Sequence, residues 1–128
     1  MQDRPTAQEL LAAVRYFLEH DIMPTLEGRR RFHTLVAANV LHIIERELTH
    51  EEPSLAAEWA RLAALPNMNA GEIPTSLAAL RTTVRDLTLR LSEKIRAGDF
   101  DDSPEVREHL RQTTVEKLRI ANPRMLHE

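Results

Sequence analysis

The chain has 128 residues, of which 42% are hydrophobic and 4% aromatic, and it carries a formal net charge of −3 with the histidines neutral. It contains no cysteine, which excludes disulfides, thiolate zinc sites and cysteine nucleophiles. The length predicts a single domain over residues 1–128, and the acidic balance argues against partners such as nucleic acid or an anionic membrane.

The first predicted helix begins after Thr6, because Glu9 three residues later completes a capping box. Apolar residues follow at helical spacing as far as Ile22, and Pro24 then interrupts the pattern. This stretch is polar at its start, unlike a secretory signal, and no apolar run approaches the roughly 20 residues of a membrane span. We therefore expect a cytoplasmic protein.

A second helix is predicted from a start between Thr25 and Arg30 to about His50. At 100° per residue its apolar side chains extend well past half of its circumference. They are Phe32, Leu35, Val36, Ala37, Val40, Leu41, Ile43, Ile44 and Leu48. An apolar arc this broad is typical of a central helix that is contacted on several sides.

The sequence Glu52-Pro53-Ser54 predicts a break, followed by a short third helix over Leu55–Leu65 that contains Trp59. We expect Trp59 to pack as a lid on the other helices. The segment PNMNAGEIP, residues 66–74, predicts the longest loop.

The fourth predicted helix is capped by Thr75 or Ser76 and stops at Gly98. Its apolar residues alternate in steps of three and four, the narrow seam of a helical bundle, and are Leu77, Leu80, Val84, Leu87, Leu91 and Ile95. The fifth begins after Ser103, with Pro104 in the first turn, and ends at Asn122-Pro123.

These elements predict an all-α fold. Short connections between consecutive long helices favour antiparallel neighbours. We therefore expect an up-down antiparallel bundle of four long helices, with the short third helix as a connection.

Several polar residues fall inside apolar stripes. On the second helix they are His33, Asn39 and Glu47, and on the fifth they are Thr113 and Lys117. If the two stripes face one another, Lys117 reaches Asn39 or Glu47 inside the bundle, since buried charges need partners. The set predicts either a pocket for a small anionic or amide-bearing ligand, or a buried hydrogen-bond network that fixes helix register.

The other patterns in the sequence indicate neither a metal site nor a catalytic site. The histidines lack the i, i+3 or i, i+4 spacing of a helical metal site, and nucleophile-elbow, P-loop and dinucleotide motifs are missing, so we expect no metal, no cofactor and no catalytic residues. Arg29, Arg30 and Arg31 place positive charge at the unfavourable end of the helix dipole. This arrangement favours a partner or phosphate contact, with a solvated turn as the alternative.

Three segments resemble one family: RPTAQELL, GRRRFHTLVAANVLHIIEREL and LRQTTVEKLRIANPR. It is an uncharacterised bacterial family of small helical proteins, classed as a domain of unknown function. The resemblance implies genes beside, or joined to, aminoglycoside-phosphotransferase-like kinases and acyl-CoA dehydrogenase-like proteins. It also draws attention to residues outside the polar stripes, such as Glu45, Arg46, Asn122, Pro123 and Arg124, the last a further candidate partner or phosphate contact.

The sequence thus predicts a non-enzymatic accessory module that binds a kinase-like or acyl-CoA dehydrogenase-like partner. The alternative is a helical bundle that binds an anionic or acyl-CoA-type ligand. Self-association as a homodimer is a further alternative, because Leu89 lies off the main seam of the fourth helix.

Overall fold

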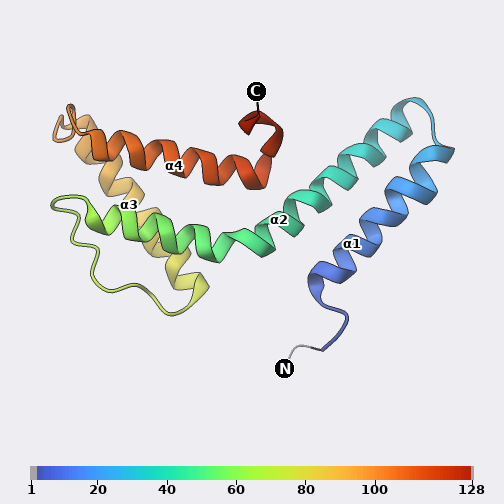
Figure 1. The fold of residues 1–128 in the computed structure, drawn as a ribbon, viewed down its shortest axis with the longest axis horizontal. Helices are drawn as coiled ribbons and strands as arrows, with labels where there is room; N and C mark the ends of the chain where they lie inside the picture. The colour runs from blue at the N-terminus through green and yellow to red at the C-terminus, as the bar shows by residue number, and fades with distance from the viewer. Residues whose placement is uncertain (1–2, 128) are drawn as a thin grey trace.

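In a computed structural model, described for residues 3–127, the chain is all-helical and that range contains no strand (Figure 1). The fold class predicted from the sequence is confirmed. The α-helices of this range are α1 (Ala7–Phe17), α2 (Gly28–Ala64), α3 (Leu77–Arg96) and α4 (Pro104–Ala121). A π-helix (Leu18–Ile22) and a 3-10 turn (Met23–Thr25) join α1 to α2, and a second 3-10 turn (Pro123–Leu126) follows α4.

The predicted caps begin three of these helices. The Thr6 hydroxyl accepts the Glu9 amide at 3.1 Å, and the Glu9 carboxylate accepts the Thr6 amide at 3.3 Å, which completes the capping box. The hydroxyls of Ser76 and Ser103 accept amides of their own first turns at 3.1 and 3.3 Å. Each bond satisfies an amide that has no partner inside the helix.

Helix α2 is one element of 37 residues, so the predicted break at Glu52-Pro53-Ser54 and the separate short helix over Leu55–Leu65 are wrong. Pro53 lies inside the helix, where it cannot donate to the carbonyl one turn earlier. The residues just after it, including Leu55 and Trp59, pack on the hydrophobic core, and this packing holds the helical conformation. The helix changes direction near its middle (Figure 1), as expected at an internal proline.

The core lies where the C-terminal half of α2 meets α3, α4 and the loop over residues 65–76. Leu62 and Met68 are its most completely buried side chains, and Trp59 packs against it as predicted. The seam predicted for α3 is confirmed at its four central positions, Leu80, Val84, Leu87 and Leu91. We call this part of the molecule, residues 51–121, the body.

Helix α3 crosses the C-terminal half of α2 obliquely, and the two run in the same general direction (Figure 1). Its first turns bind the middle of α2 through Arg81 and Glu51, and its last turn, at Lys94, lines a hollow with Ala64 at the end of α2. The expectation of antiparallel neighbours is therefore wrong at this step. The loop over residues 65–76 can span roughly 40 Å, whereas the C-terminal half of α2 is only about 20 Å long, so the chain can return before α3 starts.

Helix α1 and residues 28–50 of α2 form an antiparallel hairpin that extends away from the body (Figure 1), and we call it the arm. Among the described residues α1 packs on α2 and on the π-helix that follows it, whereas α3 and α4 pack on α2. The described helices thus share α2 without closing into one four-helix bundle.

Replacing Leu62 by Ala should lower the free energy of unfolding by about 3 kcal/mol, because a fully buried leucine leaves a cavity in the body. Urea denaturation measures this change. Leu89→Ala on α3, where the leucine is exposed, is the matched control and should cost well under about 1 kcal/mol. Equal losses in the two variants would contradict the core described here.

Candidate functional site

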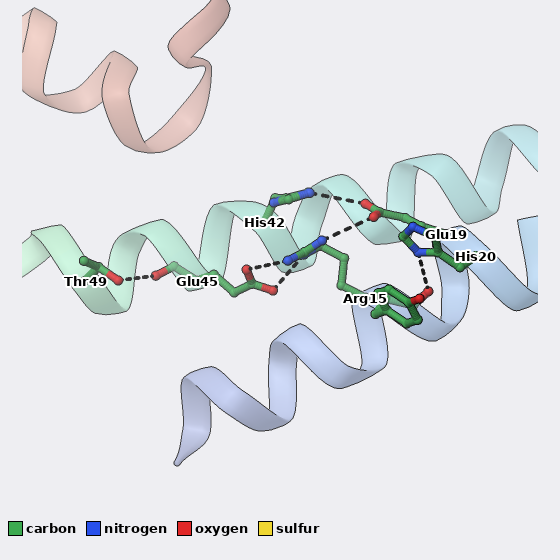
Figure 2. A network of polar contacts seen from close by, with 7 residues as sticks. Arg15, Glu19, His20, His42, Glu45 and Thr49 are labelled. Atoms are coloured by element: carbon green, nitrogen blue, oxygen red, sulfur yellow. Dashed lines mark hydrogen bonds and ion pairs between the residues drawn. The ribbon is translucent and has the colours of Figure 1, made fainter. Parts of the chain in front are cut away.

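A group of charged side chains joins the two helices of the arm (Figure 2). The Arg15 guanidinium donates to both carboxylate oxygens of Glu45, at 2.9 and 3.3 Å, and to Glu19 at 3.2 Å. His42 Nε2 lies 3.2 Å from the other oxygen of Glu19. Hydrogen bonding to Glu45 raises the pKa of Arg15 above its ordinary value, so the guanidinium stays charged. Glu45, which the family resemblance draws attention to, therefore fixes α1 on α2.

Asn39 lies in an open cleft of about 600 Å³ between α2, the π-helix and the end of the chain. The cleft also contains His42, Arg46, Asn122 and Arg124, and we call it the C-terminal cleft. The guanidinium and amide groups around it donate hydrogen bonds that suit a carboxylate or a phosphate.

Arg46 has a second, structural contact at this cleft. Its Nε donates to the carbonyl oxygen of Ile120, in the last turn of α4, at 2.7 Å. A cation at a helix C-terminus satisfies an unpaired carbonyl and interacts favourably with the helix dipole. Arg46 therefore fixes the end of α4 against α2 and forms one wall of the cleft.

Lys117 lies in a different hollow, of about 210 Å³, between α2 and α4. Glu47 and Thr113, two other residues of the predicted polar set, line this hollow together with Glu58 and Glu116. The structure thus brings three of the five predicted residues together and leaves Asn39 and His33 apart from them.

His33 lies near the tip of the arm, in an open groove of about 530 Å³ that Arg29 and Arg30 also line. The Arg31 guanidinium donates to the carbonyl oxygen of Met23 at 3.0 Å, which ties the start of α2 to the preceding turn. The three arginines therefore differ in role: Arg31 has a structural contact, while Arg29 and Arg30 face an open surface.

The expected meeting of Asn39 and Lys117 inside an apolar interior is wrong. Both side chains are exposed, as are His33 and Glu47, so these residues do not form a buried network. The reason is the position of α4, whose last turn reaches α2 at Arg46. Asn39 lies seven residues earlier on α2, about 10 Å along the helix and beyond the end of α4.

A largely buried polar cluster exists between α2 and α4. It contains Thr113 of the predicted polar set, but its other members were not predicted from the sequence. Arg61 on α2 donates to the two carboxylate oxygens of Glu116 on α4, at 2.8 and 3.0 Å, and to the Thr113 hydroxyl at 3.2 Å. Glu58 and His109 are buried beside this pair, with 7% and 3% of their surface exposed. The i, i+4, i+7 spacing of His109, Thr113 and Glu116 places them on one face of α4 and could have revealed the cluster.

The environment of this cluster disfavours charge on two of its members. Burial raises the pKa of Glu58, and burial together with the nearby Arg61 guanidinium lowers the pKa of His109. The buried His109 Nδ1 has no hydrogen-bond partner among residues 3–127. The Arg61–Glu116 pair holds α4 on α2, and the neutral imidazole packs beside it.

The largest apolar exposure is on the arm. Phe32, Val36, Val40, Ile44 and Leu48 follow one another at intervals of four along α2, and between 37% and 62% of each side chain is exposed. We call these five residues the apolar row. On α1, Leu10, Val14 and Phe17 share one face and are about half exposed. Each helix of the arm therefore leaves large apolar side chains exposed in this structure.

The sequence model of the domain of unknown function DUF6285 matches residues 24–125. The chain belongs to this family. The matched part of the DUF6285 chain includes the apolar row, the buried cluster and the C-terminal cleft except Glu19, whereas α1 and the π-helix precede it. No curated protein and no solved structure matches the chain. The predicted membership of a family of unknown function is thus confirmed.

Two further observations concern the described part of this DUF6285 chain, residues 3–127. None of its helices has the length and apolar character needed to cross a membrane. Within the same residues, no three histidine or carboxylate side chains are grouped so as to bind a metal ion.

His109 should make the stability of this DUF6285 chain depend on pH. The unfolded chain takes up a proton at this histidine below about pH 6.5, but the buried imidazole resists protonation, so the free energy of unfolding falls as the pH drops. Glu58 acts in the opposite direction. Because burial raises its pKa, the folded chain keeps the carboxyl proton to a higher pH than the unfolded chain does. The free energy of unfolding therefore falls as the pH rises above the ordinary pKa of a carboxyl group.

The contribution of His109 is isolated by comparing wild type with His109→Gln in urea denaturation between pH 5 and pH 7. The advantage of wild type over the variant should be larger at pH 7 than at pH 5. His50→Gln, at an exposed position on α2, should keep the wild-type slope. The same slope in all three proteins would contradict the assignment.

Proposed function

We propose that this DUF6285 chain is a non-enzymatic accessory module that binds another protein through the apolar surface of its arm. The supporting observation is the exposure of ten large hydrophobic side chains on the arm, while the body has a core of its own. Surface of this extent is unusual on a monomer unless a partner covers it.

The partner class comes from the family resemblance, which implies kinase-like and acyl-CoA dehydrogenase-like proteins. Either would dock by covering the apolar side chains of the arm, with aromatic residues as anchors. Phe17 and Phe32 supply these anchors, one on each helix of the arm.

Co-expression of the tagged chain with the kinase-like or dehydrogenase-like protein from the same genome tests the proposal. The partner should co-purify with wild type, and Phe17→Asp or Phe32→Asp should weaken the complex at least about tenfold, because each buries an unpaired charge at the contact. Leu89→Asp, on an exposed position of α3, is the control that should retain the partner. No complex with wild type at micromolar concentration would contradict the proposal.

A second candidate function is the binding of a small anionic ligand, such as an acyl-CoA-type molecule, in the C-terminal cleft. Arg46, Arg124 and His42 surround this cleft with donors. Glu19, the carboxylate that lines it, is already paired with Arg15 and His42. The positive groups that remain favour an anionic ligand.

Thermal denaturation with CoA esters and nucleotides tests this candidate, since a ligand that binds only the folded chain raises the melting temperature. Arg124→Ala should abolish the shift. Lys117→Ala should leave it unchanged, because Lys117 lies in a separate hollow. A wild-type melting temperature that stays constant at millimolar ligand would exclude such binding.

A further inference from the structure

One buried carboxyl group in the body has no partner. Only 7% of Glu58, on α2, is exposed, and no hydrogen bond or ion pair joins its carboxyl to another of residues 3–127. The neighbouring Glu116 carboxylate, by contrast, is bound by Arg61 at 2.8 Å. A carboxylate that is removed from water is costly unless a donor or a cation binds it. Such an exception points to a ligand that supplies the missing contact.

Glu58 lines the hollow of about 210 Å³ between α2 and α4 in which Lys117 also lies. The lining residues of α2 recur at helical spacing from Glu47 to Glu58, and those of α4 recur in the same way from Thr113 to Ile120. One face of each helix therefore forms each wall. At roughly 30 Å³ for each water molecule of the liquid, the hollow has room for about seven waters or for a small organic molecule.

The charge of the hollow favours a cation. Four carboxyl groups line it, and Lys117 is the one basic residue among them. Two of the carboxylates, Glu51 and Glu116, are bound by arginines that lie outside the lining. Glu47 and Glu58 then outnumber the ammonium of Lys117, which acts on Glu58 through its charge and forms no ion pair with it. This negative balance disfavours an anionic ligand.

The remaining walls suit an alkylammonium group. A primary ammonium donates three hydrogen bonds, which can reach the Glu58 carboxylate and the hydroxyl oxygens of Ser54 and Thr113. Leu55 and Ile120 supply apolar surface for the attached methylene groups. A hydrogen bond from an ammonium to a carboxylate is about twice as strong as one between neutral groups. The hollow thus combines a counter-ion with a short apolar wall.

We propose that the hollow between α2 and α4 binds a short primary alkylammonium group, with Glu58 as its counter-ion. The ammonium donates to the Glu58 carboxylate, and the alkyl chain lies against Leu55 and Ile120. Lys117, which is exposed, competes for the same carboxylate. This inference goes beyond the proposed function and is independent of it, because no residue of the apolar row lines the hollow.

Burial raises the pKa of Glu58, which makes the binding depend on pH. Charged groups lie around this carboxyl on both helices: Arg61, Glu47 and Glu51 on α2, and Glu116 and Lys117 on α4. Because the folded chain holds the Glu58 proton to a higher pH than an ordinary carboxyl does, the carboxylate is lost early as the pH falls. An alkylammonium stays charged up to about pH 10. Binding should therefore be tighter at pH 8 than at pH 5.

An amide NMR titration of the isotope-labelled chain with n-butylammonium, at constant ionic strength and pH 8, tests the proposal. Amides around Glu58 and Thr113 should shift with a dissociation constant on the order of 1 to 10 mM, as expected for so small a ligand. n-Butanol has the same chain without the charge, and tetramethylammonium has the charge without an N–H donor. Both should bind at least about tenfold more weakly.

Two variants assign the binding to this hollow. Glu58→Gln keeps the size of the side chain and removes its charge, so it should weaken butylammonium binding at least about tenfold. Glu52→Gln, at an exposed position of α2 outside the hollow, is the matched control and should bind like wild type. Lys117→Met removes the competing ammonium and should tighten binding roughly threefold. Since Lys117 is exposed, this variant tests the site even if Glu58→Gln fails to fold.

The ligand has two possible sources, because a lysine side chain also ends in a butylammonium group. Nα-Acetyl-lysine amide in the same titration distinguishes them. Tighter binding of this compound than of butylammonium identifies the lysine of another protein as the source, and weaker binding identifies a free amine. Either result supports the site if it depends on Glu58.

Three outcomes would overturn the inference. The first is the absence of a saturable shift in wild type at about 100 mM butylammonium. The second is equal binding by wild type and a folded Glu58→Gln variant. The third is equal binding of n-butanol and butylammonium, which would show that the hollow takes up the alkyl chain without regard to charge. None of these results bears on the co-purification of a partner with the arm.

Discussion

The organisation of this protein depends on the length of α2 relative to the core that it helps to form. The helix has 37 residues and is about 55 Å long, whereas α3, with 20 residues, is about 30 Å long. Only the part of α2 that lies beside α3 and α4 is enclosed. The remainder projects, and in the described residues it is contacted mainly by α1, by the turns that follow α1 and, at Arg46, by the last turn of α4. This excess of helix exposes the apolar row.

Local features of the sequence predicted the ends of most helices. Thr6, Ser76 and Ser103 accept first-turn amides, and α4 ends where Asn122 precedes Pro123. These predictions succeed because a cap depends on residues a few positions apart. The prediction at Pro53 failed because the same residue type begins one helix and bends another. Which of the two occurs depends on how Leu55 and Trp59 pack, which is tertiary information.

Burial was predicted less well than helicity. The broad apolar arc of α2 predicted a helix contacted on several sides, but within one chain its N-terminal half is contacted mainly by α1. Helical phase gives the direction of a side chain and does not say which element covers it. For the same reason Asn39 was expected in an interior, whereas it lies in an open cleft. The burial of Glu58 and His109 was not predicted, because the packing of their helices against each other could not be read from the sequence.

Pro53 lies at the start of the body, close to the point where α2 passes from the arm into it. Because the helix is uninterrupted there, the two parts are connected by a stiff spacer and not by a flexible tether. Pro53 removes one backbone hydrogen bond of the helix, and its ring clashes with the carbonyl one turn earlier, so the helix bends there and remains continuous. The tip of the arm and the partly buried ion pair of Arg61 and Glu116 therefore lie on opposite sides of the bend.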